Sequence, residues 1–188
     1  MKIFTLRKKF KHFLNKYVQK LDVRNRTNTG RKNKYDNFFY IKRILDYLIN
    51  GVSWYKMQSS LEEYGITVDA IRKKFNKWIE IGVFSKAFSD FVTVYGKRNS
   101  DKIKEMFMDA AVIKNVTARE NITGFCKKMP NKRSSKATII CDRNKIGLSV
   151  VVTGSKEHDS KHIEKCIDKL PEFALLISLR SVHYVHRS

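Results

Sequence analysis

The sequence is poor in cysteine, and its cysteines do not form the patterns that metal or disulfide frameworks require. Cys126, Cys141 and Cys166 are its only three, they lie far apart, and no Cys-x-x-Cys pair occurs. A zinc site or a disulfide framework is therefore not expected. We predict ordinary thiols in a reducing compartment.

Long hydrophobic runs are also missing. No apolar run reaches the ~18 residues that a membrane span requires, and the N-terminus lacks the apolar core and small-residue cleavage site of a signal peptide. The sequence therefore predicts a soluble, intracellular protein, and no membrane is expected among its partners.

Acidic residues are scarce relative to basic ones. The chain has 39 Lys and Arg residues against 18 Asp and Glu, a net charge of +21, while 42% of its residues are hydrophobic and can form a core. The positive charges on the surface of such a protein repel one another, and binding of a polyanion relieves that repulsion. Nucleic acid is the commonest such partner. Coding bias toward Lys and Asn explains part of the excess but not its clustering.

The first half of the chain has helical periodicity and clustered basic residues. Residues 3–21 form, at helical spacing, one apolar face and one basic face. Such a helix can pack on a domain or lie on an anionic membrane. Residues 24–34 are polar and basic, and we expect an arm that contacts phosphates or the minor groove; the alternative is a solvated loop. Further helices are expected from Asp36 to Gly51, over 54–61, from Thr67 to Gly82, and from there to Gly96.

The helix after Thr67 has two distinct faces. Its apolar stripe is formed by Val68, Ile71, Phe75 and Trp78. The opposite face carries Arg72, Lys73, Asn76 and Lys77 at the spacing of neighbours on a helix. A short helix, a turn and a helix with such a face indicate a helix-turn-helix, whose second helix enters the major groove. The alternative is a basic, solvated face on a core helix.

The polar segment 96–101 divides the sequence, and we predict domains at 1–96 and 97–188. Strands are expected over 106–113 and 173–179, and as a hairpin over 137–141 and 146–153. Residues 115–136 are predicted to be an exposed insertion. A helix beginning at Ser160 should bury Ile163, Cys166, Ile167 and Leu170, and we interpret His158-Asp159 as its capping segment.

Asp109 is the strongest candidate for chemistry. It stands in an apolar strand, where burial of a carboxylate is costly without a counter-charge such as a metal ion. The alternative is an aspartate exposed to water at the end of a strand.

The order of these signals resembles DDE-type transposases of bacterial insertion sequences. The match runs from about residue 28 to 170, and its single pieces are weak but stand in the right order. In the first half the similar segments are Gly30–Tyr35 ("GRPxKY"), Gly51–Trp54 with Tyr64-Gly65, Thr67–Trp78 ("TVYRRFRRW") and Gly82–Phe84. In the second half they are Met108–Ile113 ("xDSTxI"), Lys136–Asp142 with Gly147-Leu148, and Thr153–Ser160 ("TxGxxHDS").

The resemblance implies an α+β chain: an all-α, helix-turn-helix-like domain followed by an incomplete ribonuclease-H-like α/β domain. It implies that Asp109 is the first of three carboxylates, two Asp and one Glu, that hold Mg²⁺ for DNA cleavage and transfer. The segment expected to supply the second Asp, residues 173–183, has no acid, and the chain ends at Ser188 before any region that could supply the Glu. We therefore expect a C-terminally truncated, catalytically incomplete transposase.

The expected partners are double-stranded DNA and either a second copy of the chain or a full-length transposase. The expected DNA contacts are Arg31, Lys32, Lys34, Arg72, Lys73, Asn76 and Lys77. A non-catalytic DNA-binding regulator or inhibitor of a full-length transposase is the alternative, and a basic scaffold that binds RNA or membrane is a third.

Overall fold

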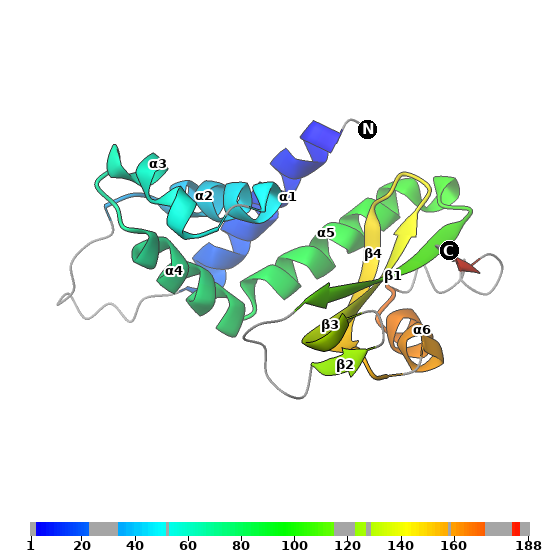
Figure 1. The fold of residues 1–188 in the computed structure, drawn as a ribbon. Coiled ribbons are helices and arrows are strands. Elements are labelled where there is room, and N and C mark those ends of the chain that lie inside the picture. Colours follow the sequence, from blue (N-terminus) through cyan, green and yellow to red (C-terminus); the bar gives the residue numbers. More distant parts are fainter. Residues whose placement is uncertain are drawn as a thin grey trace. The chain divides into compact units, whose positions relative to one another are not determined.

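The computed structural model describes residues 3–22, 34–51, 53–114, 123–126, 129–157, 159–171 and 182–184. It contains both helices and a sheet, which confirms the α+β class (Figure 1). The chain divides into two compact units, Met1–Phe91 and Val92–Ser188. The division falls five residues before the boundary predicted at 96/97.

The first unit is helical. Its elements are α1 (Ile3–Leu21), α2 (Asn37–Asn50), a 3₁₀ turn (Tyr55–Met57), α3 (Ser59–Glu62), α4 (Val68–Glu80) and the first part of α5 (Val83–Asn99). The predicted N-caps are confirmed: the Asp36 carboxylate accepts a hydrogen bond from Phe39 N at 2.9 Å, and Thr67 Oγ1 accepts one from Ala70 N at 3.4 Å. Gly51 and Gly82 have positive φ at the ends of α2 and α4, as predicted.

The core of this unit joins α1, α2, α4 and the start of α5. Leu14 and Val18 of α1 are buried beside Ile41 and Ile44 of α2. Trp78 and Ile71 of α4 are also buried, and Val68 and Phe75 pack against this core. The predicted apolar stripe of α4 is therefore confirmed, and its position leaves the opposite face of the helix in solvent.

The predicted end of α5 at Gly96 is wrong. The helix continues to Asn99 and is followed by a 3₁₀ turn at Ser100–Lys102. Gly96 is buried and is not among the residues with positive φ. It lacks the left-handed backbone conformation with which a glycine ends a helix.

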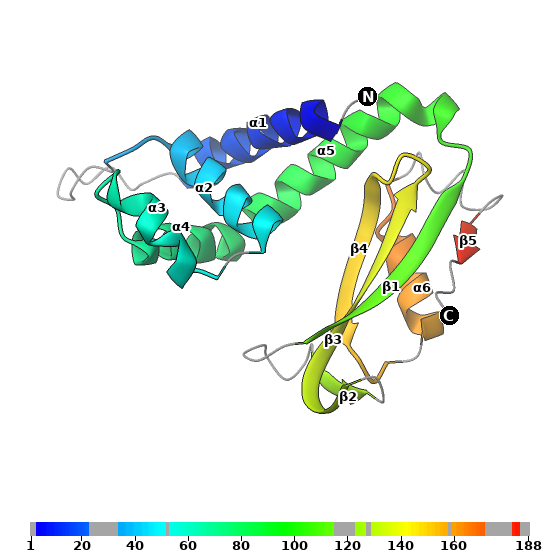
Figure 2. The ribbon, with the colours of Figure 1, turned by 45° about the horizontal axis from the view of Figure 1, so that its top comes forward.

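The second unit contains a sheet covered on one face by α6 (Asp159–Asp168) (Figure 2). Its strands are β1 (Met106–Lys114), β2 (Gly124–Cys126), β3 (Met129–Asp142), β4 (Gly147–Gly154) and β5 (Val182–Tyr184). The strand order is β2-β3-β1-β5, with β4 also paired to β3. Among these described strands, pairing is antiparallel except between β1 and β5, which are parallel.

The expectation of an exposed insertion over 115–136 is wrong for its described part. Residues 124–126 and 129–136 form β2 and the first half of β3. Ser134 is buried; its hydroxyl donates to Gly124 O at 3.2 Å, and Ser155 Oγ lies 2.9 Å from the same hydroxyl oxygen, within hydrogen-bond distance. A polar segment can therefore join the sheet, because strand pairing and hydroxyl contacts satisfy its polar groups.

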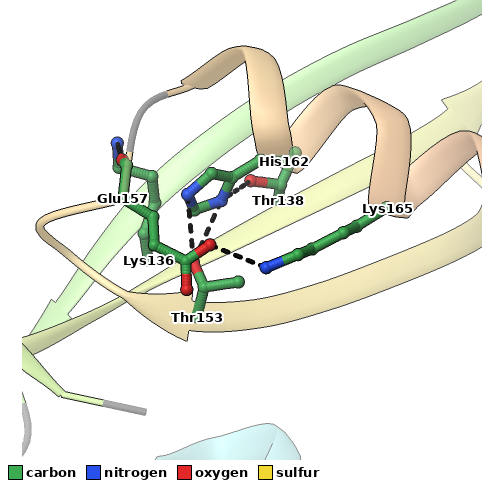
Figure 3. A network of polar contacts seen from close by, with 6 residues as sticks. All are labelled: Lys136, Thr138, Thr153, Glu157, His162 and Lys165. Carbon is green, nitrogen blue, oxygen red and sulfur yellow. Dashed lines mark hydrogen bonds and ion pairs between the residues drawn. The ribbon is translucent and has the colours of Figure 1, made fainter. Parts of the chain in front are cut away.

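The face of the sheet under α6 combines apolar and polar side chains. Met108 and Ile140 of the sheet are buried there against Cys166 and His162 of α6, which are also buried. The sequence pattern did not indicate the burial of His162. Figure 3 shows the His162 ring between two threonine hydroxyls: Thr138 Oγ1 lies 3.3 Å and Thr153 Oγ1 lies 3.0 Å from Nδ1. Thr153 Oγ1 also lies 3.1 Å from Nε2, so each ring nitrogen has a hydroxyl within hydrogen-bond distance.

The remaining sequence predictions for this unit have mixed outcomes. The hairpin is confirmed, with Asp142–Lys145 at its turn and Lys145 at a φ of 62°. Helix α6 begins at Asp159, one residue earlier than predicted, and it buries Cys166 as expected. The strand predicted over 173–179 and His158 lie outside the described residues, whereas β5 was not predicted.

Candidate nucleic-acid interface and the position of Asp109

Helix α4 presents a polar, basic face to solvent. Arg72, Lys73 and Asn76 are exposed, and α3 and a turn with Gly65 at a φ of 57° precede the helix. Arg72 and Asn76 are one turn apart, as are Lys73 and Lys77. The face therefore offers two side chains able to make bidentate base contacts beside lysines suited to phosphates.

Lys77, the last of the four DNA contacts predicted on α4, forms an ion pair within the first unit. Asp22, directly after α1, has a side chain that is only 4% exposed. Its carboxylate accepts hydrogen bonds from Trp78 Nε1 at 2.8 Å, from Lys74 Nζ at 3.5 Å and from Lys77 Nζ. Asp22 therefore fastens the end of α1 to α4 and neutralises part of its charge.

The surroundings of Asp22 keep its carboxyl group ionised. Burial raises the pKa of Asp22, but the hydrogen bonds from Lys77 and Trp78 and the charges of Lys74 and Lys77 outweigh burial, so the pKa is lowered overall. Sequence analysis did not select this residue. The available signal was that Asp22 is the only acid before Asp36 in a strongly basic stretch.

Lys34 contacts the turn that leads into α4. Its Nζ donates to Tyr64 O at 2.8 Å, and Tyr35 Oη donates to the same oxygen at 3.0 Å. The predicted DNA-contact residue Lys34 thus has a structural partner. The neighbouring predicted contacts Arg31 and Lys32 lie outside the described residues.

An arginine that the sequence analysis missed lies among aromatic rings beside this turn. The Arg43 guanidinium is 4.5 Å from the centroid of the Tyr64 ring and 5.3 Å from that of Phe39. Tyr35 stacks on Phe39 with ring centroids 4.3 Å apart. Arg43 Nε is buried and makes no hydrogen bond within the described part of the chain.

Asp109 lies within β1, so the strand predicted around it is confirmed. It is half-buried and pairs in register with Ile139 of β3, and its Oδ1 accepts a hydrogen bond from Ala110 N at 2.8 Å. Asp109 therefore occupies a mid-strand position and not an exposed strand end. Its charge also acts on a neighbour: burial raises the pKa of the Cys141 thiol, and the charges of Asp142 and Asp109 raise that pKa further.

The described neighbours of Asp109 supply no second carboxylate for a metal site. Among the described residues, no three or more His, Cys, Asp or Glu side chains are grouped to hold a metal ion. The described residues of β5, beside β1, are Val182, His183 and Tyr184 and include no acid. Mg²⁺ takes one or two carboxylates with water and phosphate oxygens, and Asp109 supplies one carboxylate of such a set.

A second buried acid in this unit has a structural role. Asp142 accepts hydrogen bonds from Tyr95 Oη at 2.5 Å, Ile146 N at 2.9 Å and Asn144 Nδ2 at 3.2 Å. Burial, together with the hydrogen bond to Asp142, raises the pKa of Tyr95 to about 12. These contacts stabilise the β3–β4 turn and give the buried carboxylate of Asp142 its hydrogen-bond donors.

No protein-family model, curated protein or solved structure matches the chain. Within the described part of the chain, every helix is too short or too polar to cross a membrane.

Proposed function

We propose that the protein is a transposase-derived DNA-binding protein whose helix α4 reads the major groove. The observation that carries this proposal is the arrangement of α4. Its Ile71 and Trp78 are buried in the core, while Arg72, Lys73 and Asn76 are exposed on the other side of the helix. A preceding short helix and turn complete the order of a helix-turn-helix.

The side chains of α4 have distinct roles in this proposal. Arg72 and Asn76 contact base edges, where a good bidentate contact contributes about 1–3 kcal/mol of discrimination. Lys73, which is exposed, contacts phosphate. Lys77 contributes less, because Asp22 already neutralises it.

Ancestry from a DDE transposase is supported by the second unit. A ribonuclease-H-like layer requires a hairpin beside the first strand and, after a helix, a parallel strand on its other side. The order β4-β3-β1-β5, with β5 parallel to β1, fits that requirement. Asp109 then occupies the position of the first Mg²⁺-binding carboxylate. We propose that metal-dependent strand cleavage and transfer is the ancestral activity and that catalysis is incomplete in this chain.

Sequence selection followed by substitution tests the role of α4. Duplexes enriched by the wild-type chain from a random library would be compared with unselected duplexes by fluorescence anisotropy. Arg72→Ala or Asn76→Ala should reduce the preference for enriched sequences by about tenfold, because each removes a side chain that hydrogen-bonds to base edges. Lys73→Ala should weaken binding to both sets alike.

Lys86→Ala is the matched control, since Lys86 is an exposed lysine on α5 of the same unit. It should leave the preference unchanged. An unchanged preference in Arg72→Ala and Asn76→Ala as well would refute groove reading by α4.

The second candidate function is a non-catalytic regulator or inhibitor that binds DNA, alone, as a homodimer or with a full-length transposase. It is favoured by the acid-free residues described in β5 beside Asp109. Incubation of supercoiled DNA with the chain and Mg²⁺ or Mn²⁺ tests the lack of catalysis that both functions share. Neither function expects nicking by the wild-type chain. Nicking that disappears in Asp109→Ala but persists in Asp101→Ala, a change of an exposed acid in the same unit, would establish an enzyme and refute both.

A further inference from the structure

Strand β2 lies at the end of the sheet opposite the β3–β4 turn (Figures 1 and 2). This end carries basic residues, and we call it the β2 end and define it by Lys114, Phe125, Arg133 and Lys156. All four are exposed. None of them belongs to α4 or to the surroundings of Asp109.

Strand register joins β1, β3 and β2 at this end of the sheet. Lys114 of β1 pairs with Ser134 of β3, and Ser134 pairs with Gly124 of β2. Neighbouring strands lie about 4.8 Å apart, so this row crosses the sheet within about 10 Å. Phe125 follows Gly124 on β2 and Arg133 precedes Ser134 on β3, so both are sequence neighbours of this row, although the pairing of β2 with β3 is irregular between Gly124 and Cys126.

Lys156 reaches this row from the loop after β4. A Cβ added to Gly124 would lie 3.0 Å from Lys156 Cγ, which shows how closely the lysine covers β2. Its Nζ lies 5.9 Å from the centroid of the Phe125 ring, and Phe125 is 50% exposed. An exposed aromatic ring thus lies beneath a lysine side chain.

The nearby acid Glu157 does little to neutralise this surface. Its carboxylate pairs with Lys165 at 2.7 Å, while its backbone oxygen accepts from Lys136 Nζ at 3.4 Å (Figure 3). Glu157 is therefore balanced by Lys165 of α6 and brings a further lysine, Lys136, toward the same end. The four residues that define the β2 end include three cations and no acid.

We propose that the β2 end is a second nucleic-acid contact surface, in which the three cations bind the sugar–phosphate backbone and Phe125 packs on a base or sugar. Exposed aromatic side chains between basic ones are the pattern of surfaces that bind nucleic acid without sequence preference. An anionic membrane would instead favour an amphipathic helix with several inserted apolar side chains, and the β2 end is a sheet rim with one aromatic ring. The proposal shares only its ligand class with the proposed function of α4.

The test uses the full chain and two variants that remove equal charge. Lys114→Gln/Arg133→Gln/Lys156→Gln changes the β2 end, and Lys102→Gln/Lys104→Gln/Arg143→Gln changes exposed residues of the same unit outside it. Anisotropy with random-sequence single-stranded and duplex DNA is measured between about 50 and 200 mM salt. The β2-end variant should bind at least about tenfold more weakly, and its salt slope should be shallower by about one for each phosphate that it no longer binds. The control variant should change affinity by about twofold at most.

Phe125→Leu separates stacking from charge. It should weaken binding of single-stranded DNA more than of duplex DNA if the ring packs on a base, and both equally if it packs on sugar. Matching circular dichroism and thermal unfolding curves exclude misfolding, and any variant that fails this check is replaced by its single substitutions.

Equal losses of affinity in the two charge variants, or no loss in either, would overturn the proposal. So would a β2-end variant that loses binding to phosphatidylserine vesicles but keeps its affinity for DNA. The two proposals fail separately. A β2-end effect without an effect of Arg72→Ala on sequence preference refutes only the role of α4, and the reverse refutes only the role of the β2 end.

Discussion

At the scale of single residues, Asp22 combines burial with charge. Its carboxylate is almost inaccessible and has three nitrogen donors from α4, two of them cationic. A buried ion pair is costly to break because removal of one partner leaves the other charge uncompensated. The orientation of α4 relative to α1 therefore depends on the ionisation of Asp22.

We predict that Asp22→Asn destabilises the first unit by about 2 kcal/mol at neutral pH, because the amide keeps an acceptor for Trp78 but loses both ion pairs. The folded pKa of Asp22 is lowered. Its ionic contribution is therefore present above the unfolded pKa of about 3.9 and is lost as pH falls through the lower folded value. Urea unfolding followed by tryptophan fluorescence should show Asp22→Asn and wild type converging toward acid pH.

Asp90→Asn provides the control, since Asp90 pairs with Lys16 at 3.0 Å on the exposed surface of the same unit. Exposed pairs contribute little to stability, so this variant should remain close to wild type. Both tryptophans, Trp54 and Trp78, lie in the first unit, and the signal reports on that unit. A constant difference between Asp22→Asn and wild type from neutral to acid pH would contradict the prediction.

At the scale of secondary-structure elements, the turn between α3 and α4 decides how the candidate recognition helix begins. Two donors, from Lys34 and Tyr35, converge on Tyr64 O, and Gly65 follows with a φ of 57°. A residue with a side chain adopts this left-handed conformation at a cost. A Cβ at position 65 would also lie 2.8 Å from Lys34 Nζ.

We predict that Gly65→Ala destabilises the first unit by about 1 kcal/mol from backbone conformation alone, with a further loss because the Lys34 ammonium must move. Gly51→Ala is the matched control: Gly51 has a φ of 61°, and no atom lies within 4 Å of an added Cβ. Urea midpoints should rank wild type, Gly51→Ala and Gly65→Ala in falling order. If the extra loss persists in Lys34→Ala/Gly65→Ala, displacement of Lys34 is not its cause.

Elements could be predicted from sequence where local signals determine them. The caps at Asp36 and Thr67 were predicted because an N-cap depends on a few adjacent residues, and the two faces of α4 were predicted because helical spacing separates them. The first half of β3 was missed, because it is held by pairing with β2 and, from Ser134 on, with β1 and β4, and not by an apolar pattern of its own.

The candidate site likewise has features that could be predicted from the sequence and features that could not. The exposed residues Arg72, Lys73 and Asn76 follow from helical spacing. The partner of Lys77 did not, since Asp22 lies 55 residues away in sequence. The packing of Arg43 against Tyr64 and the burial of His162 likewise depend on tertiary contacts that a single sequence does not reveal.

At the scale of the whole molecule, the excess of positive charge is distributed over both units. The α4 face lies in the first unit and the β2 end in the second. The net charge is +21. Because release of counterions from DNA accompanies each phosphate contact, a protein with two such surfaces should bind DNA with a strong dependence on salt.

We predict that affinity for random-sequence duplex DNA falls by at least about 10³-fold between about 50 and 200 mM salt, as expected for six or more phosphate contacts. Anisotropy titrations at several salt concentrations measure this slope. A fall of less than about tenfold would show that few of the basic residues contact phosphates.

The attachments of Asp22 and Lys34 hold α4 near both of its ends. Asp22 is fastened to Trp78 in the last part of α4, and Lys34 is fastened to the turn that precedes α4. The orientation of the helix is therefore fixed by parts of the chain that precede α2. If α4 has the proposed function, it is preorganised: the helix does not have to be ordered when a ligand binds, which lowers the entropic cost of association.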